Sequence, residues 1–217
     1  IIAHFSSGML HLWFTVLGIL ILLNITLAII ASYLFYDRSI LYKPKKLFFD
    51  LKFNSDTKAI LLHASFDPIS PELEQIITPN NLSVYNIYGN RHEHDKAIEI
   101  SNQIFPPSKR EIMINPSNLP DKSESVDFIL AITSLHEIMS QENRVAFFKE
   151  AKRVLKPDGK LIIVEQLRNK MNFLFFNIGA FHFASLTNWE KGISEGGLKI
   201  VKRGNITHWG TILHVTK

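Results

Sequence analysis

The chain has 217 residues, enough for one membrane anchor of about 20 residues and one domain of about 100–150 residues, so we expect no second globular domain. Its formal net charge is only +4 and no basic stripe is interleaved with aromatic residues, so we expect no nucleic-acid partner. The absence of cysteine excludes disulfides, thiolate nucleophiles and cysteine-based zinc sites.

Residues 1–36 form the first predicted unit. They contain no Asp, Glu, Lys or Arg, and the stretch from Leu12 to Tyr36 is almost wholly aliphatic or aromatic. About 20 apolar helical residues cross the hydrocarbon of a bilayer, so we expect a single-pass transmembrane helix. A cleaved signal peptide is the alternative, but the segment is too long and lacks a basic start and a small-residue cleavage site. Because the sequence begins at Ile1, further spans upstream stay open.

Residues 37–55 form a basic and aromatic connector. Arg38, Lys43, Lys45 and Lys46 follow the apolar segment directly, and positive residues are retained on the cytoplasmic side of a membrane. We therefore expect the rest of the chain on the cytoplasmic side or its organellar equivalent. The run from Tyr42 to Phe53 alternates basic and aromatic residues, which is typical of an amphipathic segment along the membrane surface.

Residues 56–217 alternate short apolar runs with longer mixed segments, a pattern that predicts an α/β domain with a parallel sheet and crossover helices. The expected helices are Pro71–Ile77, His94–Ile104 and Glu142–Leu155. The expected strands are Ala59–His63, Ser83–Ile87, Glu111–Ile114, Phe128–Thr133, Lys160–Glu165, Leu198–Gly204 and Thr211–Thr216.

The block from Leu119 to Glu165 carries several landmarks in a fixed order: Leu119-Pro120 before an acidic turn, Ser125-Val126-Asp127 opening a strand, Leu135-His136 closing it, and the turn Arg153–Gly159 before the next strand. This block resembles the second half of class I S-adenosylmethionine-dependent methyltransferases of type 11. The resemblance implies a seven-stranded Rossmann-like sheet with helices on both faces. It also implies S-adenosylmethionine as the cofactor if the protein is active.

The positions that match the cofactor pocket of that family are altered. His63, Ser65 and Asp67 stand where the family has a glycine-rich loop, which lets the backbone approach the ligand closely. Tyr88 stands where an acidic residue contacts the ribose, and Asn115 replaces an Asp near the adenine. Between Gly18 and Gly159 the only glycine is Gly89, so no shift of alignment restores the loop. We therefore expect a degenerate pocket without a cofactor.

Two residues are the candidates for proton transfer. His136 follows the fourth strand and Glu165 ends the fifth, at the edge where open parallel sheets bind ligands. A helix-start histidine without chemistry is the alternative for His136. The crowded run Arg91–Asp95 contains histidine and carboxylate ligands, but a solvated helix start explains it better, so we expect no metal site.

The segment Met171–Ser185 is unusually aromatic and predicts contact with the bilayer, a lipophilic substrate or partner subunits, with core burial as the alternative. The leading hypothesis is a membrane-anchored pseudo-methyltransferase, a structural or accessory subunit of a membrane complex that uses the helix and this segment. The alternatives are an active methyltransferase acting on a lipophilic acceptor, and a domain that binds another nucleotide or a lipid. An enzyme needs an open crevice at the strand ends, whereas His63, Phe66 and Tyr88 would fill it in a scaffold.

Overall fold

The structure is a computed structural model that describes residues 7–88, 100, 103–104 and 106–217. Its strands are β1 Ala59–His63, β2 Leu82–Asn86, β3 Ile112–Met113, β4 Val126–Ile132, β5 Leu155–Gln166, β6 Lys199–Asn205 and β7 Gly210–Thr216. Its helices are α1 Ser7–Ser32, α2 Pro44–Leu47, α3 Ser70–Leu73, α5 Gln141–Val154, α6 Lys170–Phe176 and α7 Leu186–Glu195. Shorter or irregular helical segments are η1 Tyr33–Arg38, η2 Pro79–Asn81, η4 Leu135–Glu137 and η5 Asn177–His182.

The seven strands form one sheet in the order β3-β2-β1-β4-β5-β7-β6. Neighbours from β3 to β5 pair in parallel, whereas β7 lies antiparallel between β5 and β6. The chain leaves β1 toward β2 on one side and places β4 on the other. The switch point of the sheet therefore lies between β1 and β4, where open α/β sheets bind their ligands. This sheet, with helices on both faces, confirms the predicted fold class.

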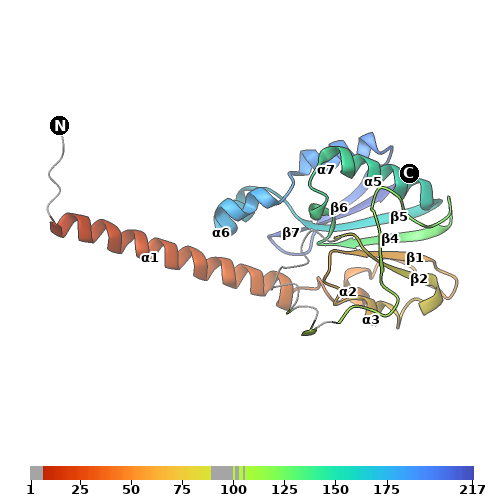
Figure 1. The fold of residues 1–217 in the computed structure, drawn as a ribbon, viewed down its shortest axis with the longest axis horizontal. Helices are drawn as coiled ribbons and strands as arrows, with labels where there is room; N and C mark the ends of the chain where they lie inside the picture. The colour runs from red at the N-terminus through yellow and green to blue at the C-terminus, as the bar shows by residue number, and fades with distance from the viewer. Residues whose placement is uncertain (1–6, 89–99, 101–102, 105) are drawn as a thin grey trace.

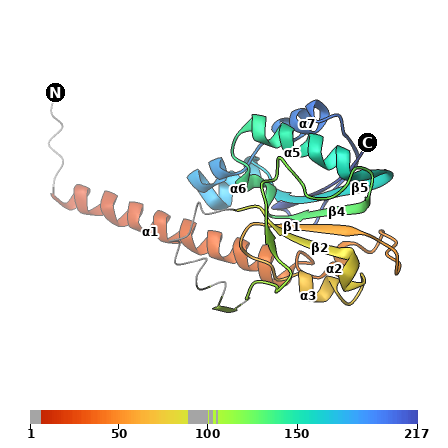
Figure 2. The same ribbon diagram turned by 45° about the vertical axis from the view of Figure 1, so that its right-hand side comes forward.

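Helices α5 and α7 cover one face of the sheet, and α2 and α3 lie on the other (Figures 1 and 2). The first face buries Phe147, Phe148 and Trp189 against strand residues such as Ile129 and Ile163. A second cluster of buried side chains fills the opposite face and includes residues from the end of α1. The N-terminal segment is therefore part of the core on that face.

Two elements differ from the expected boundaries. Strand β5 begins at Leu155 rather than Lys160, because Leu155 pairs with Val126 before a bulge leads to the Phe128–Lys160 pair. The helix expected over Pro71–Ile77 is regular only to Leu73, and turns continue to Ile77. Most of the helix expected over His94–Ile104 lies outside the described residues.

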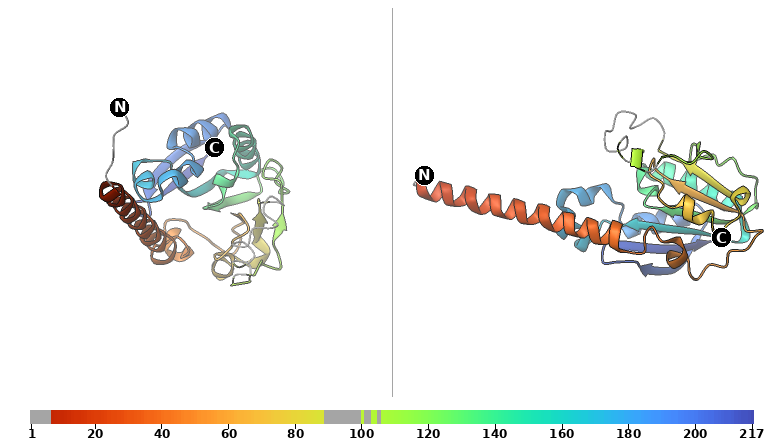
Figure 3. Two further views of the ribbon diagram at one scale, coloured as in Figure 1. Left: turned by 60° about the vertical axis from the view of Figure 1, so that its left-hand side comes forward. Right: turned by 90° about the horizontal axis from the view of Figure 1, so that it is seen from below.

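Helix α1 projects away from the α/β domain as a long rod (Figure 3). With η1 it gives a 31-residue helical span, Gly8–Arg38, that is long and apolar enough to cross a membrane, and its side chains are mostly exposed. The Thr26 hydroxyl donates to the Leu22 carbonyl oxygen at 2.8 Å, so this mid-helix polar group is satisfied within the helix, as a bilayer requires.

The expected surface connector packs on the domain instead. Leu41, Leu47 and Phe48 are buried in the second cluster, against strands β1, β2 and β4. An amphipathic pattern is satisfied equally by a membrane surface and by an uncovered sheet face, and here the sheet face buries the apolar side chains. The basic residues Lys43, Lys45 and Lys46 keep exposed positions, and so does Phe49, which is 79% exposed.

The end of the long apolar helix is fixed to the sheet by one close contact. Phe35 of η1 is fully buried, and a Cβ atom added at Gly210, the first residue of β7, would overlap its ring. Only glycine at this position lets the Phe35 ring come so close to the backbone of β7. The direction in which α1 leaves the domain depends on this contact.

We predict that Gly210→Ala lowers the free energy of unfolding by about 1–3 kcal/mol, because the added methyl group overpacks the Phe35 site. Chemical denaturation of the detergent-solubilised chain measures it. The matched control is Gly179→Ala, where the nearest atom to an added Cβ lies 3.9 Å away. Equal stability of the two variants would contradict the assigned role of Phe35.

Candidate functional site

A polar network joins the carboxyl ends of β1 and β2 to Glu111, the residue just before β3. His63 and Asn86 are register partners at the ends of β1 and β2, and both are buried. The Asn86 Nδ2 group donates to Glu111 Oε1 at 3.0 Å, and His63 Nε2 lies 3.2 Å from Glu111 Oε2. Burial would raise the pKa of Glu111, but His63 and Asn86 more than offset this and hold it below its ordinary value.

The loop after β1 contains one left-handed residue that is not glycine. Ser65 has φ +62°, a left-handed conformation that usually favours glycine. The Ser65 amide donates to Asn86 Oδ1 at 3.2 Å. Asp67 Oδ1 accepts the amides of Ile69 and Ser70 at 3.0 and 2.9 Å, just ahead of α3. The backbone donors of this loop are therefore used by the chain itself.

Of the other two predicted pocket residues, Tyr88 lies at the margin of this network and Asn115 lies apart from it. The Tyr88 amide donates to Asn86 Oδ1 at 3.0 Å, which ties the loop after β2 to the same side chain. Asn115 is exposed, and its Oδ1 accepts the amide of Ser117 at 2.9 Å in a local turn. The structure brings together His63, Ser65 and Tyr88 through Asn86, whereas Asn115 stays outside.

A row of aromatic rings, Tyr36, Tyr42 and Phe66, crosses the carboxyl edge of the sheet. The rings of Tyr42 and Phe66 meet edge to face at 5.8 Å, and those of Tyr36 and Tyr42 stack at 6.4 Å. The Tyr36 hydroxyl donates to Gln166 Oε1, at the end of β5, at 2.8 Å. Burial, together with nearby Tyr36, raises the pKa of Tyr42. The aromatic row thus runs from the end of β5 to the loop after β1, across the switch point.

Glu165 organises the loop after β4. Its side chain is 1% exposed, and Oε1 accepts the amides of Ser134, Leu135 and His136 at 3.0, 2.8 and 3.2 Å. Its other oxygen, Oε2, lies 2.8 Å from His136 Nδ1. A buried carboxylate with four partners is satisfied, and it fixes both the η4 backbone and the imidazole of His136.

The imidazole of His136 lies between two carboxylates. Its Nδ1 faces Glu165, and its Nε2 lies 3.4 Å from Glu137 Oε1. Burial alone would lower the pKa of His136, but Glu165 and Glu137 more than offset this and raise it to about 10. The raised pKa favours the protonated ring at neutral pH. The two predicted proton-transfer residues do meet, as an ion pair.

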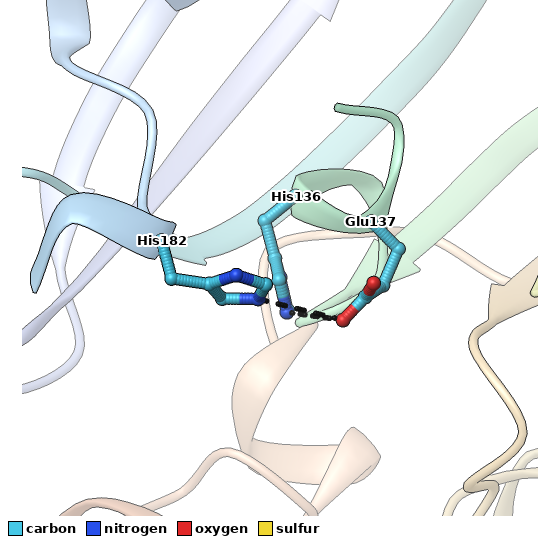
Figure 4. Close-up of side chains that lie close together, drawn as sticks. All are labelled: His136, Glu137 and His182. Atoms are coloured by element: carbon cyan, nitrogen blue, oxygen red, sulfur yellow. Dashed lines mark ion pairs between the residues drawn. The ribbon is translucent and has the colours of Figure 1, made fainter. Parts of the chain in front are cut away.

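A third side chain that the sequence analysis did not single out joins this pair. His182, the last residue of η5, places Nε2 3.5 Å from Glu137 Oε1, and the His136 and His182 rings lie 5.1 Å apart (Figure 4). We name His136, Glu137 and His182 the His-Glu-His cluster. No local spacing predicts it, because His182 reaches the cluster only after β5 and α6 have been traversed.

The segment that carries His182 is held in place by one buried amide. The Asn172 Nδ2 group of α6 donates to the carbonyl oxygens of Leu167 and Trp209 at 2.7 and 3.1 Å. Asn169 caps α6 by accepting the Asn172 amide at 2.9 Å. Asn177 then turns the chain into η5 with φ +52°. Two asparagines thus anchor and start the helix, and a third makes the sharp turn that aims His182 at η4.

A cavity of about 660 Å³ adjoins the cluster, a size within the range of small-molecule sites. One wall is formed by α1 and η1, including Asn24, Ala28 and Asp37. The other wall is formed by α6 and η5, and it includes Phe176 and His182. Helix α6 lies beside α1 in all views (Figures 1–3), so this cavity opens where the domain meets the membrane helix.

We predict that Glu165→Ala lowers the free energy of unfolding by about 3–5 kcal/mol, because it leaves three buried amides and a charged imidazole without their shared acceptor. Thermal unfolding followed by circular dichroism measures it. Glu190→Ala, at an exposed glutamate of α7, is the matched control and is expected to change stability by less than about 0.5 kcal/mol. Similar losses in both variants would show that Glu165 does not organise the loop.

Comparison by sequence finds one family. The methyltransferase domain family matches residues 91–163, a range that ends within β5. No curated protein matches the chain.

Comparison by structure finds S-adenosylmethionine-dependent methyltransferases. The enzyme from Aquifex aeolicus is 18% identical with a TM-score of 0.58, and the match covers 85% of this chain and 92% of that one. The enzyme from Methanosarcina mazei is 17% identical with a TM-score of 0.54, covering 79% and 96%. That from Clostridium acetobutylicum is 14% identical with a TM-score of 0.54, covering 81% and 89%. The sequence match over residues 91–163 and the shared fold make this chain similar to S-adenosylmethionine-dependent methyltransferases.

Proposed function

We propose that this chain is a membrane-anchored member of the methyltransferase fold that does not catalyse methyl transfer and serves as an accessory subunit of a membrane complex. The observation that carries the proposal is the aromatic row across the switch point. Tyr42 comes from the segment after the membrane helix, and its ring packs on Phe66 where the crevice between β1 and β4 would receive a ligand. The chain fills this position with its own side chains.

The residues at the strand ends do not fit S-adenosylmethionine. A cofactor site needs free backbone donors after β1 and an acidic acceptor after β2. Here the Ser65 amide is bonded to Asn86, and the Asp67 carboxylate takes the first amides of α3. Tyr88 brings a phenol where a carboxylate is needed, and the carboxylate of Glu111 is engaged by His63 and Asn86. No step of a methyl transfer is therefore assigned to these residues.

The surface around the membrane helix supports an attachment role. The apolar side chains of Leu174 and Ile178, in α6 and η5, are 63% and 79% exposed beside α1. An apolar surface that continues an exposed apolar helix favours a bilayer or a partner subunit over water. The exposed lysines after η1 favour the cytoplasmic side for the α/β domain.

Isothermal titration with S-adenosylmethionine and S-adenosylhomocysteine tests the loss of the cofactor site. We predict no heat of binding at micromolar concentrations for the detergent-solubilised chain, because the loop donors are already bonded. Ala64→Trp is the matched variant, since it adds bulk in the loop after β1 and is expected to change nothing. Micromolar binding that Ala64→Trp abolishes would overturn the proposal.

A second prediction concerns attachment. The double variant Leu174→Glu and Ile178→Glu is expected to shrink the particle seen on size exclusion in mild detergent, because charge on this surface opposes burial against partner subunits. Val201→Glu is the matched control, since Val201 is 54% exposed on β6 at the edge of the sheet. If all variants migrate as the unaltered protein does, α6 and η5 are not the contact with a partner.

One observation favours a second function, an active methyltransferase with a lipophilic acceptor. The cavity between α1 and α6 is mostly apolar, is open to the membrane helix and has His182 in its wall. A lipophilic molecule could enter it from the bilayer. Cofactor binding in the titration above, followed by transfer of a labelled methyl group to a membrane-extracted lipid, would establish this function in place of the first.

A further inference from the structure

We propose that the His-Glu-His cluster binds one divalent transition-metal ion, with zinc as the ion its ligands fit best. The site consists of His136 and Glu137 from η4 and His182 from η5. This inference goes beyond the proposed function and holds whether or not the protein transfers methyl groups.

The spacing of the ligand atoms is that of a metal site. His136 Nε2 lies 3.4 Å from Glu137 Oε1, and His182 Nε2 lies 3.5 Å from the same oxygen. All three ligand atoms lie within 4.8 Å of one another. Zinc binds imidazole nitrogen and carboxylate oxygen at about 2.0–2.2 Å, so two ligands of a tetrahedral ion are separated by about 3.4 Å. Two of the three separations therefore match those around a tetrahedral ion, and the third lies within 4.8 Å.

The outer contacts of His136 are those of a metal ligand. Metal-bound histidines nearly always pass their second ring nitrogen to a carboxylate or carbonyl, which fixes the ring and its tautomer. Here Glu165 Oε2 lies 2.8 Å from His136 Nδ1, and three backbone amides hold the Glu165 carboxylate itself. Nδ1 is thereby occupied, and Nε2 points at Glu137 and His182. This buried support is independent of the three ligand atoms.

An ion pair alone does not explain the second histidine. His136 has two carboxylate partners without His182, yet the side chain of His182, 41% exposed, turns back to the same Glu137 oxygen (Figure 4). A divalent cation accounts for both rings, because two imidazole nitrogens and a carboxylate oxygen that converge on one point are ligands of such an ion.

The ligand set also indicates the kind of ion and its effect. Two imidazoles and one carboxylate, without thiolate, suit zinc, and three protein ligands leave a fourth position open. Since the ligands come from η4 and η5, the ion would tie the cover formed by α6 and η5 to the end of β4. Metal binding would thus close the wall of the cavity that contains His182.

Titration of the full-length, detergent-solubilised protein with zinc chloride tests the proposal. We expect one Zn²⁺ per chain at micromolar affinity or tighter, and at least a tenfold weaker affinity for His182→Gln. His208→Gln is the matched control, because His208 is also exposed but lies outside the cluster, and it should bind as the unaltered protein does. Because the side chain of His182 is 41% exposed, His182→Gln should keep the fold, and circular dichroism checks this.

A second measurement reports on the ligands themselves. Co²⁺ in place of Zn²⁺ should give the visible absorption of a low-coordinate nitrogen and oxygen site, and His182→Gln should lose it. Zinc should also raise the melting temperature of the unaltered protein and not that of His182→Gln, since an ion that binds only the folded state stabilises it. Equal zinc affinity in His182→Gln and His208→Gln, or no binding by the unaltered protein, would overturn the site.

Discussion

The buried carboxylate of Glu165 is the interaction on which the functional edge of this molecule depends. A charge at 1% exposure is tolerated only when hydrogen bonds and a counter-ion replace its water. The amides of residues 134–136 and the imidazole of His136 supply both. The demand of one buried charge therefore dictates the path of the chain after β4. That path also determines the positions of the side chains that η4 presents at this edge, including Glu137.

The N-terminal segment fixes the chain on the opposite side of the switch point, as Glu165 fixes η4. Phe35 packs closely against Gly210 of β7, and the chain then continues along the carboxyl edge of the sheet. Tyr36 and Tyr42 then lie over the ends of β5 and β4, with Tyr42 against Phe66. The position of the N-terminal helix and the covering of the crevice thus both depend on the packing of Phe35 against Gly210. A free domain without this segment would expose the edge that the aromatic row covers.

The sheet was predictable because buried parallel strands appear as short apolar runs. Strand β1 has the predicted bounds, Ala59–His63, and most of the other strands differ by one or two residues. The early start of β5 was not predictable, since the Pro157–Gly159 bulge has the sequence of a turn. Helix α6 was missed because its phenylalanines lie on all sides and show no single apolar face.

The candidate site was predictable only where one strand end placed its residues. His136 and Glu165 follow adjacent parallel strands, so their approach could be expected. His182 could not be, since its place depends on the Asn172 amide bonds and the turn at Asn177. The packing of the connector was unpredictable for a different reason. An amphipathic sequence determines which side chains need an apolar surface, but not which surface buries them. Here the face of the sheet buries these side chains, and the same packing places Tyr42 against Phe66.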